Sequence, residues 1–503
     1  MMRLNGLACG IFVLCVTMVV ASSAQTLTTL ASFDGANGAF PDYGALIQGT
    51  DGNFYGTTEQ GGVNSSGTVF KITADGVLTT LYSFCMQANC VDGSFPQGGL
   101  VQASNGNFYG TTNQGGQNSL GTVFKITPEG EFTTLRSFCT RASCSDGTNP
   151  VAGLIQGSDG NLYGTTQLGG IINGDCTLGC GTFFKITVNG TLTTLYSFCL
   201  QANCADGSFP QGSLTQASNR NFYGTTNQGG QSGLGSAFEI TPKGQLTTIH
   251  SFCTRASCSD GTNPTAGLIR GTDGNFYGTA SLGGILNRDC TLGCGTFFEI
   301  SAKGSFTSLY GFCLEANCTD GSFPEGGLVQ GTDGNFYGTT NQGGQNDLGT
   351  AFEMSPEGSL ATLRSFCIRA SCSDGTNPVA AMIQGTDGDF YGTTQLGGMA
   401  TKDCLQGCGT VFSLSTGLSP FVALARGFGS VGQTVRILGQ GFTGTTAVSF
   451  HGTNAPFSVK SDTFLTATVP AGAVTGSVRV STPAGVLRSN VPFQVIQPRS
   501  SRN

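Results

Sequence analysis

The stretch GTDGNFYGTTNQGG spans residues 331–344, and near-copies of its first half begin at residues 51, 105, 273 and 387. The tyrosine of this stretch recurs at intervals of 54 or 60 residues, at Tyr55, Tyr109, Tyr163, Tyr223, Tyr277, Tyr337 and Tyr391. A second interval of 114 residues separates Tyr109, Tyr223 and Tyr337, so a two-repeat unit has been triplicated after one single copy. Periods of this size indicate a repeat array or a propeller.

Each copy contains four short runs with strand composition. In the second copy these are GGLVQAS (98–104), NFYGTT (107–112), GTVFKIT (121–127) and FTTLRSF (132–138). Their Thr, Val, Phe and Tyr content and their alternation predict strands. In six of the seven copies the first two runs are joined by Asn-Gly or Asp-Gly, the dipeptides of two-residue hairpins. Each copy is therefore predicted to form one four-stranded antiparallel sheet, and the Asp-Gly is interpreted as a turn, in preference to a calcium loop.

Seven such sheets predict an all-β fold, a seven-bladed β-propeller. The N-terminal run LTTLASF (27–33) matches the fourth run LTTLYSF (78–84), while the seventh copy ends after its third run, GTVFSLS (409–415). We therefore expect the N-terminal strand to complete the last blade and to close the ring. A linear solenoid, which would need polar caps, is the alternative.

The chain ends differ from the repeats. Residues 1–24 have the pattern of a signal peptide, with Arg3, an apolar run over 7–20 and a small-residue cleavage site. The predicted domains are the signal peptide (1–24), the propeller (25–416), a small immunoglobulin-like β-sandwich (417–496) and a disordered tail (497–503). We expect an exported, secreted or cell-surface monomer, without membrane insertion once the signal is removed. The net charge of −7 disfavours nucleic acid as a partner.

Eighteen cysteines follow the signal peptide in nine closely spaced pairs, six of the form C-x4-C and three of the form C-x3-C. An even count in an exported chain predicts local disulfides. Zinc is the alternative, disfavoured because only two histidines are present; no metal and no cofactor are expected. The predicted pairs are Cys85 with Cys90, Cys139 with Cys144, Cys199 with Cys204, Cys253 with Cys258, Cys313 with Cys318, Cys367 with Cys372, Cys176 with Cys180, Cys290 with Cys294, and Cys404 with Cys408.

The repeated FYGTT, the GG that follows it, GTVFKIT and LTTLYSF resemble the GloVer tandem repeat of exported bacterial proteins, over roughly residues 26–415. Members of that family carry varied C-terminal anchors. Residues 418–496, with GQGF (439–442) and TVP (468–470), resemble an IPT/TIG immunoglobulin-like domain. These resemblances imply a surface or secreted protein with spacer or binding modules, and they bring no catalytic residues.

In an up-and-down blade, the longer connections lie on the face opposite the Asp-Gly turns, and loops on a rigid scaffold commonly carry binding groups. Three arginines in C-x4-C loops and three asparagines in second-to-third loops are the predicted binding residues. They are Arg141, Arg255 and Arg369, with Asn113, Asn227 and Asn341. The arginines could instead cover loop surface or pair locally.

No catalytic residue is predicted. His250 replaces the tyrosine of LTTLYSF and His451 lies in the other domain, so both are interpreted as structural, and the copy-specific acids Glu131, Glu299, Glu315 and Glu353 form no common pattern. The predicted function is a non-catalytic binding or structural protein, with multivalent contacts to polysaccharide or to another surface protein. The alternative is a secreted polysaccharide-cleaving hydrolase or lyase on a propeller scaffold.

Overall fold

The computed structural model describes residues 25–496. The predicted signal peptide (1–24) and tail (497–503) lie outside the described residues. Between residues 25 and 496 the chain is all-β, as predicted, and its helical parts are six short 3-10 turns. These turns are η1 (Ala88–Cys90), η2 (Ala142–Cys144), η3 (Ala202–Cys204), η4 (Ala256–Cys258), η5 (Ala316–Cys318) and η6 (Ala370–Cys372). None of the helices in this described part is long and apolar enough to cross a membrane.

The repeats form seven four-stranded antiparallel sheets, which we number sheets 1 to 7 in chain order. Sheets 1 and 2 contain β2 (Ile47–Gln48), β3 (Phe54–Thr58), β4 (Thr68–Ile72) and β5 (Leu78–Ser83), then β6 (Val101–Gln102), β7 (Phe108–Thr112), β8 (Thr122–Ile126) and β9 (Phe132–Ser137). Sheets 3 and 4 contain β10 (Ile155–Gln156), β11 (Leu162–Thr166), β12 (Thr182–Ile186) and β13 (Leu192–Ser197), then β14 (Thr215–Gln216), β15 (Phe222–Thr226), β16 (Ser236–Ile240) and β17 (Leu246–Ser251). Sheets 5 and 6 contain β18 (Ile269–Arg270), β19 (Phe276–Ala280), β20 (Thr296–Ile300) and β21 (Phe306–Gly311), then β22 (Val329–Gln330), β23 (Phe336–Thr340), β24 (Thr350–Met354) and β25 (Leu360–Ser365).

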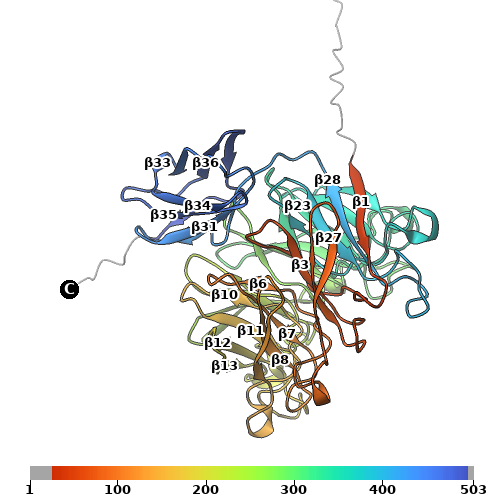
Figure 1. Cartoon of the computed structure of the whole chain (residues 1–503). Coiled ribbons are helices and arrows are strands. Elements are labelled where there is room, and N and C mark those ends of the chain that lie inside the picture. The colour runs from red at the N-terminus through yellow and green to blue at the C-terminus, as the bar shows by residue number, and fades with distance from the viewer. Residues whose placement is uncertain (1–24, 497–503) are drawn as a thin grey trace, which may run out of the picture.

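Sheet 7 is built from both ends of the repeat region. It contains β26 (Ile383–Gln384), β27 (Phe390–Thr394) and β28 (Thr410–Ser415), and its fourth strand is the N-terminal β1 (Thr26–Ser32). The red β1 runs beside the blue β28 in Figure 1, and the two pair antiparallel. Sheet 7 also contacts sheet 1, because the amide of Thr386 donates to Gln48 Oε1 at 3.0 Å and the ring of Phe54 stacks on Tyr391 at 4.0 Å.

The recurrent DGNFYGTT forms a turn and the strand that follows it. Gly52 has a φ of +85°, a conformation that glycine adopts without steric cost. The Asp51 carboxylate accepts hydrogen bonds from the Asn53 amide at 3.3 Å and from the Tyr55 hydroxyl at 2.8 Å. The tyrosine is otherwise buried and packs on the next sheet, with its ring 4.1 Å from that of Phe108. The repeated stretch is therefore a structural unit that links each turn to the core between sheets.

Residues from 418 onward form a separate domain of short strands. One sheet orders β29 (Ala423–Leu424), β31 (Thr434–Leu438), β35 (Phe464–Thr468) and β34 (Phe457–Ser461), and a second orders β33 (Thr453–Asn454), β32 (Ala447–Phe450), β36 (Val478–Thr482) and β37 (Gly485–Arg488). A parallel pair joins β30 (Phe428–Gly429) to β38 (Gln494–Val495). One apolar cluster, which includes Val435, Phe450, Leu465 and Val480, fills the domain. The domain lies against the repeat sheets in Figure 1, and Thr463 Oγ1 donates to the carbonyl of Thr50 at 2.8 Å.

Candidate functional site

The structure does not bring the three predicted arginines together. Arg141, Arg255 and Arg369 are exposed and follow the outer, fourth strands of sheets 2, 4 and 6. The Arg255 guanidinium donates to the carbonyl of Phe306 at 3.1 Å and lies 5.4 Å from the centre of its ring. Arg369 donates to the carbonyl of Leu27 at 3.3 Å. Two of the three arginines thus bridge to the outer strand of the next sheet.

The three predicted asparagines lie elsewhere, at the ends of the second strands of sheets 2, 4 and 6. Each is partly buried and receives a hydrogen bond on its backbone carbonyl from the next sheet, at 3.1–3.2 Å. The donors are the side chains of Asn149, Asn263 and Asn377, which bond to Asn113, Asn227 and Asn341 respectively. Asn113 also donates to Gln97 Oε1 at 3.0 Å. Each predicted asparagine is therefore hydrogen-bonded to the asparagine that comes directly before the recurrent proline in the next copy of the repeat.

The first strands of the seven sheets, or the residues that lead directly into them, line one cavity of about 630 Å³, which we call the central cavity. The apolar residues of its wall include Leu46, Leu100, Leu154, Leu214, Leu268, Leu328 and Met382. Small residues allow neighbouring first strands to approach each other, since a Cβ at Gly267 would lie 1.9 Å from the carbonyl oxygen of Ser213. The volume is within the usual range of ligand pockets.

Polar side chains surround the central cavity on the long-loop side. They include Tyr43, Gln97, Asn113, Gln167, Gln211 and Glu325. We call these residues, together with the adjoining Asp42, Glu59, Asn341 and Gln395, the cavity mouth. Gln97 donates to Glu59 Oε1 at 2.9 Å, and Gln395 donates to Asp42 Oδ1 at 2.7 Å. The mouth thus combines carboxyl and amide groups with one aromatic ring, which are groups that can recognise a polar ligand.

Three carboxyl groups of the mouth interact with one another. Asp42 is only 6% exposed. Burial raises its pKa to about 9, and its interactions with Glu59 and the charge of Glu325 act in the same direction, while the bond from Gln395 opposes them. Burial also raises the pKa of Glu325, against a hydrogen bond from Asn341. Asp42 is therefore held in its neutral form at neutral pH, when its carboxyl group can donate as well as accept.

Tyr43 is the aromatic residue of the mouth, and 47% of its surface is exposed. Burial of the hydroxyl end, together with the charges of Glu325, Asp42 and Glu59, raises its pKa above the ordinary value, so the hydroxyl remains a donor. An exposed ring beside hydrogen-bonding groups can stack on an apolar ligand face. The mouth thus has one stacking surface next to its carboxyl groups.

The sequence pattern did not single out Asp42, Glu59 and Glu325, because the acids compared between copies were those at other positions of the repeat. The structure does not gather Glu131, Glu299, Glu315 and Glu353: Glu315 accepts from its own loop residue Thr319 at 2.8 Å, and Glu353 binds Asn335. Asp42 and Glu325 instead follow the recurrent proline, where other copies have Gln, Val or Thr. Glu59 follows the recurrent Thr-Thr, where other copies have Asn, Gln or Ser. Comparing each of these two positions across the seven copies would have found the set.

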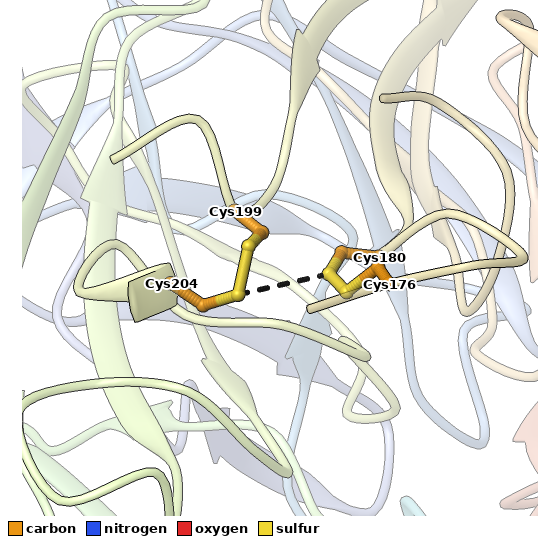
Figure 2. A group of neighbouring side chains, drawn as sticks. All are labelled: Cys176, Cys180, Cys199 and Cys204. Carbon is orange, nitrogen blue, oxygen red and sulfur yellow. Dashed lines mark hydrogen bonds between the residues drawn. A yellow bond between two sulfur atoms is a disulfide. The ribbon is translucent and has the colours of Figure 1, made fainter. Parts of the chain in front are cut away.

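The structure pairs all eighteen cysteines as the nine local disulfides that the spacing predicts. In two places two pairs come together, and all four sulfur atoms lie within 4.8 Å of one another. Figure 2 shows one such cluster, in which Cys180 Sγ lies 3.9 Å from Cys204 Sγ. The second contains Cys290, Cys294, Cys313 and Cys318. Four cysteine sulfurs in this arrangement would suit zinc if they were thiolates, the form in which cysteine binds zinc. Here the sulfurs are instead bonded to one another as disulfides.

The third C-x3-C pair has different surroundings. It joins Cys404 to Cys408 in the loop between β27 and β28 of sheet 7. Asp34 follows the phenylalanine of the N-terminal run, where the other copies have the first cysteine of a C-x4-C pair. Cys408 is fully buried in a cluster with Phe33, and its carbonyl accepts from the amide of Phe40 at 2.9 Å. This disulfide therefore packs against the N-terminal segment that completes sheet 7.

The comparison with known families accounts for the repeats. The Gloeobacter/Verrucomicrobia repeat family matches residues 16–178, 140–316 and 284–440, which together span most of the chain. The chain belongs to the Gloeobacter/Verrucomicrobia repeat family. An IPT/TIG domain, an immunoglobulin-like fold, matches residues 415–495. The predicted family and C-terminal module are thus confirmed, and each family match includes strands of more than one of our seven sheets.

Solved structures resemble this repeat protein only distantly. A fungal alcohol oxidase of the AA5 family, in complex with copper, is 13% identical with a TM-score of 0.49, covering 94% of this chain and 99% of that one. A luciferin-regenerating enzyme is 12% identical with a TM-score of 0.39, covering 79% and 97%. A protein of unknown function from Bacteroides thetaiotaomicron is 14% identical with a TM-score of 0.41, covering 78% and 76%. No curated protein matches this chain.

Proposed function

We propose that this repeat protein is an exported, non-catalytic carbohydrate-binding protein, a closed seven-bladed β-propeller whose cavity mouth holds the ligand. Contacts between sheets 7 and 1 support the closed ring, as does a cavity that residues at the start of all seven sheets line together. Nine disulfides support export, because such bonds persist in oxidising compartments. The observation that carries the proposal is the cavity mouth itself.

A sugar hydroxyl both donates and accepts hydrogen bonds, so its site needs groups of both kinds. At the mouth, Asp42 is neutral and can donate, Glu59 accepts, and the amides of Gln97 and Gln395 do both. Tyr43 offers an exposed ring on which the apolar face of a pyranose can stack. A neutral polysaccharide is the ligand class that this combination fits.

This site differs from the multivalent binding that the near-identical repeats suggested. The carboxyl groups occur only in sheets 1 and 6, so the mouth has one chemically distinct sector rather than equivalent repeated contacts. The guanidinium groups of Arg255 and Arg369 are already bonded to backbone of neighbouring sheets. We therefore expect one binding site per chain.

The test is a retention assay on a panel of neutral and acidic polysaccharides, with release of reducing ends measured in the same tubes. The Glu325→Gln and Tyr43→Ala variants should weaken retention at least about tenfold, which corresponds to about 1.4 kcal/mol. Glu315→Gln, which changes an exposed acid in a C-x4-C loop, is the matched control and should bind like the parent chain. If no polysaccharide is retained, or if both mouth variants bind as well as the parent, the proposal is wrong.

One observation favours a second candidate, a polysaccharide-cleaving enzyme. Burial and Glu59 raise the pKa of Asp42 to about 9, and a carboxyl group that stays protonated at neutral pH is one of the two that glycoside hydrolysis requires. The same assay separates the two functions. The enzyme would be established if the parent chain releases reducing ends, and if Asp42→Asn and Glu59→Gln both lose this release while they still retain the polysaccharide.

A further inference from the structure

The first strands carry a repeated glutamine that joins neighbouring sheets. It occurs in six sheets, at Gln48, Gln102, Gln156, Gln216, Gln330 and Gln384, which we call the glutamine belt. In each case Oε1 accepts from an amide in the turn of the preceding sheet, as in the bond from Thr50 to Gln102 at 3.1 Å. The side-chain amide of Gln102 donates to its own turn, at the carbonyl of Gly106. The belt lies on the face that carries the Asp-Gly turns.

Sheet 5 breaks the belt, because Arg270 occupies the seventh position. A guanidinium group has five donors and no acceptor, so Arg270 cannot accept the turn amide that a glutamine accepts. The substitution therefore gives up a bond between sheets and adds a positive charge. Neither change improves the packing of the repeat, so the arginine requires another explanation.

Arg270 lines a second cavity, of about 640 Å³, which lies between the turn face of sheets 2 to 5 and the IPT/TIG domain and is open to solvent on one side. We call it the interdomain cavity. Two arginines of the IPT/TIG domain line it from the other side. Arg426 donates to the carbonyl of Gly157 at 3.0 Å, and Arg436 donates to the carbonyl of Ala103 at 2.7 Å. Both are partly buried, and burial lowers the pKa of each, opposed at Arg426 by the charge of Asp159.

Positive charge exceeds negative charge in this cavity. Among residues 25–496, none of the three arginines lies in an ion pair with a carboxylate. The only lining carboxylate in this described part is Asp159. Its oxygens already accept from Asn161 at 2.7 Å and from the Tyr163 hydroxyl at 2.9 Å. Buried cations that bond only to neutral groups are costly unless a counter-charge is supplied.

We propose that the interdomain cavity binds a small oxyanion, a sulfate, phosphate or carboxylate group, between Arg270 on one side and Arg426 and Arg436 on the other. Arginine side chains suit this role because their planar fork bonds two oxygens of such a group at once. The anion would neutralise the excess charge and connect the two domains. The oxyanion can be a free ion or the acidic group of a saccharide, and the test distinguishes these sources. This site is independent of the cavity mouth.

The test uses the whole mature chain and the Arg270→Gln variant, which restores the residue that the other six sheets carry. Binding of inorganic sulfate, inorganic phosphate and an oligogalacturonate is measured by calorimetry in chloride buffer of constant ionic strength. We expect at least one of these probes to bind to one site, and its affinity to fall at least tenfold in Arg270→Gln. Arg288→Gln, at an exposed loop arginine, is the matched control and should bind like the parent.

Melting curves without ligand check that Arg270→Gln is folded. Binding of sulfate or phosphate identifies a free anion as sufficient, while binding of oligogalacturonate alone identifies a saccharide acid group. The proposal fails if none of the three probes binds, or if Arg270→Gln binds as tightly as the parent. Glu325→Gln should leave anion binding unchanged, so the outcome is separate from that of the carbohydrate proposal.

Discussion

Nε2 of His250 lies 3.4 Å from a carboxylate oxygen of the fully buried Asp260. In sheet 1 the hydroxyl of Tyr82 holds the corresponding Asp92 at 2.7 Å. Asp260 also accepts from the amides of Thr254 and Arg255, so it fixes the loop that the C-x4-C disulfide closes. His250 stacks on Phe306 at 3.8 Å, much as Tyr82 stacks on Phe132. The histidine therefore has the structural role that the sequence predicts.

His250→Tyr should reduce the loss of stability at acidic pH. Burial lowers the pKa of His250 to about 4, with Arg255 acting in the same direction and Asp260 opposing. Between pH 6.5 and 4 the unfolded chain binds a proton that the folded chain does not, so the free energy of unfolding falls as pH falls. Tyrosine does not bind this proton, so the variant should keep up to about 3 kcal/mol of unfolding free energy that the parent loses between pH 7 and pH 4. Urea unfolding of the parent and the variant at pH 4, 5.5 and 7 measures this difference, and His451→Gln, at an exposed histidine, is the control. If the unfolding free energies of the parent and of His250→Tyr change equally with pH, the prediction is wrong.

Asp42→Asn should stabilise the protein at alkaline pH. The pKa of Asp42 is raised from 3.8 to about 9 in the folded chain. Between about pH 4 and pH 9 the carboxyl group is therefore ionised in the unfolded chain but protonated in the folded chain, so the free energy of unfolding of the parent falls as pH rises. Asparagine has no such loss. We expect the two chains to melt alike at pH 4 and the variant to melt roughly 2–5 °C higher at pH 8. Calorimetry tests this, with Asp75→Asn, in an exposed turn, as the control variant.

Leu27→Asp should destabilise sheet 7. Leu27 of β1 is 3% exposed and packs in a cluster with Phe366, Phe390 and Leu414. A carboxylate there would be buried without a partner, and the edge of β28 would be exposed if β1 detached. We expect a loss of about 3 kcal/mol or more, with aggregation on heating. Thr28→Asp, at the neighbouring exposed position, is the control. Equal melting of both variants would show that β1 contributes little.

The disulfides should differ in their resistance to reduction. The four cysteines of the Figure 2 cluster are each at most 6% exposed, whereas Cys139 and Cys144, in an isolated pair, are partly exposed. Exchange requires a thiolate to reach the sulfur, so the partly exposed pairs should be reduced first. Timed reduction, alkylation and peptide mapping measure the order. Non-neighbour bridges in the unreduced protein, or faster reduction of the clusters, would contradict this reading.

The sheets were predictable because each copy carries its own turn and strand signals. Asp51-Gly52 forms a hairpin turn, and six of the seven repeated tyrosines pack on a phenylalanine ring of a neighbouring sheet. In the IPT/TIG domain the runs at 434–442 and 464–470 mark β31 and β35, but the exposed β34 (Phe457–Ser461) lacks the alternation that would reveal it. First strands of two residues are shorter than the runs that predicted them.

The candidate site was less predictable, because it depends on which residues the sheets bring together. Arg255 and Asn113 both belong to the long connections, yet the structure places the arginine beyond the fourth strand of its sheet, bonded to the next sheet, and the asparagine in the lining of the central cavity. Asp42 and Glu325 are 283 positions apart, and only the arrangement of the sheets makes them neighbours. The interdomain cavity depends on how two domains meet, which no local pattern encodes.

The pairing of β1 with β28 also constrains when the protein can finish folding. Sheets 1 to 6 each consist of contiguous residues, so each can form soon after its own segment has emerged from the ribosome or the export channel. Thr26 meets Ser415, however, so β1 has to wait while almost the whole repeat region is delivered. Throughout that interval β1 and the apolar surface around Leu27 stay without their partner strand, and this is the period when a chaperone would protect the chain most effectively.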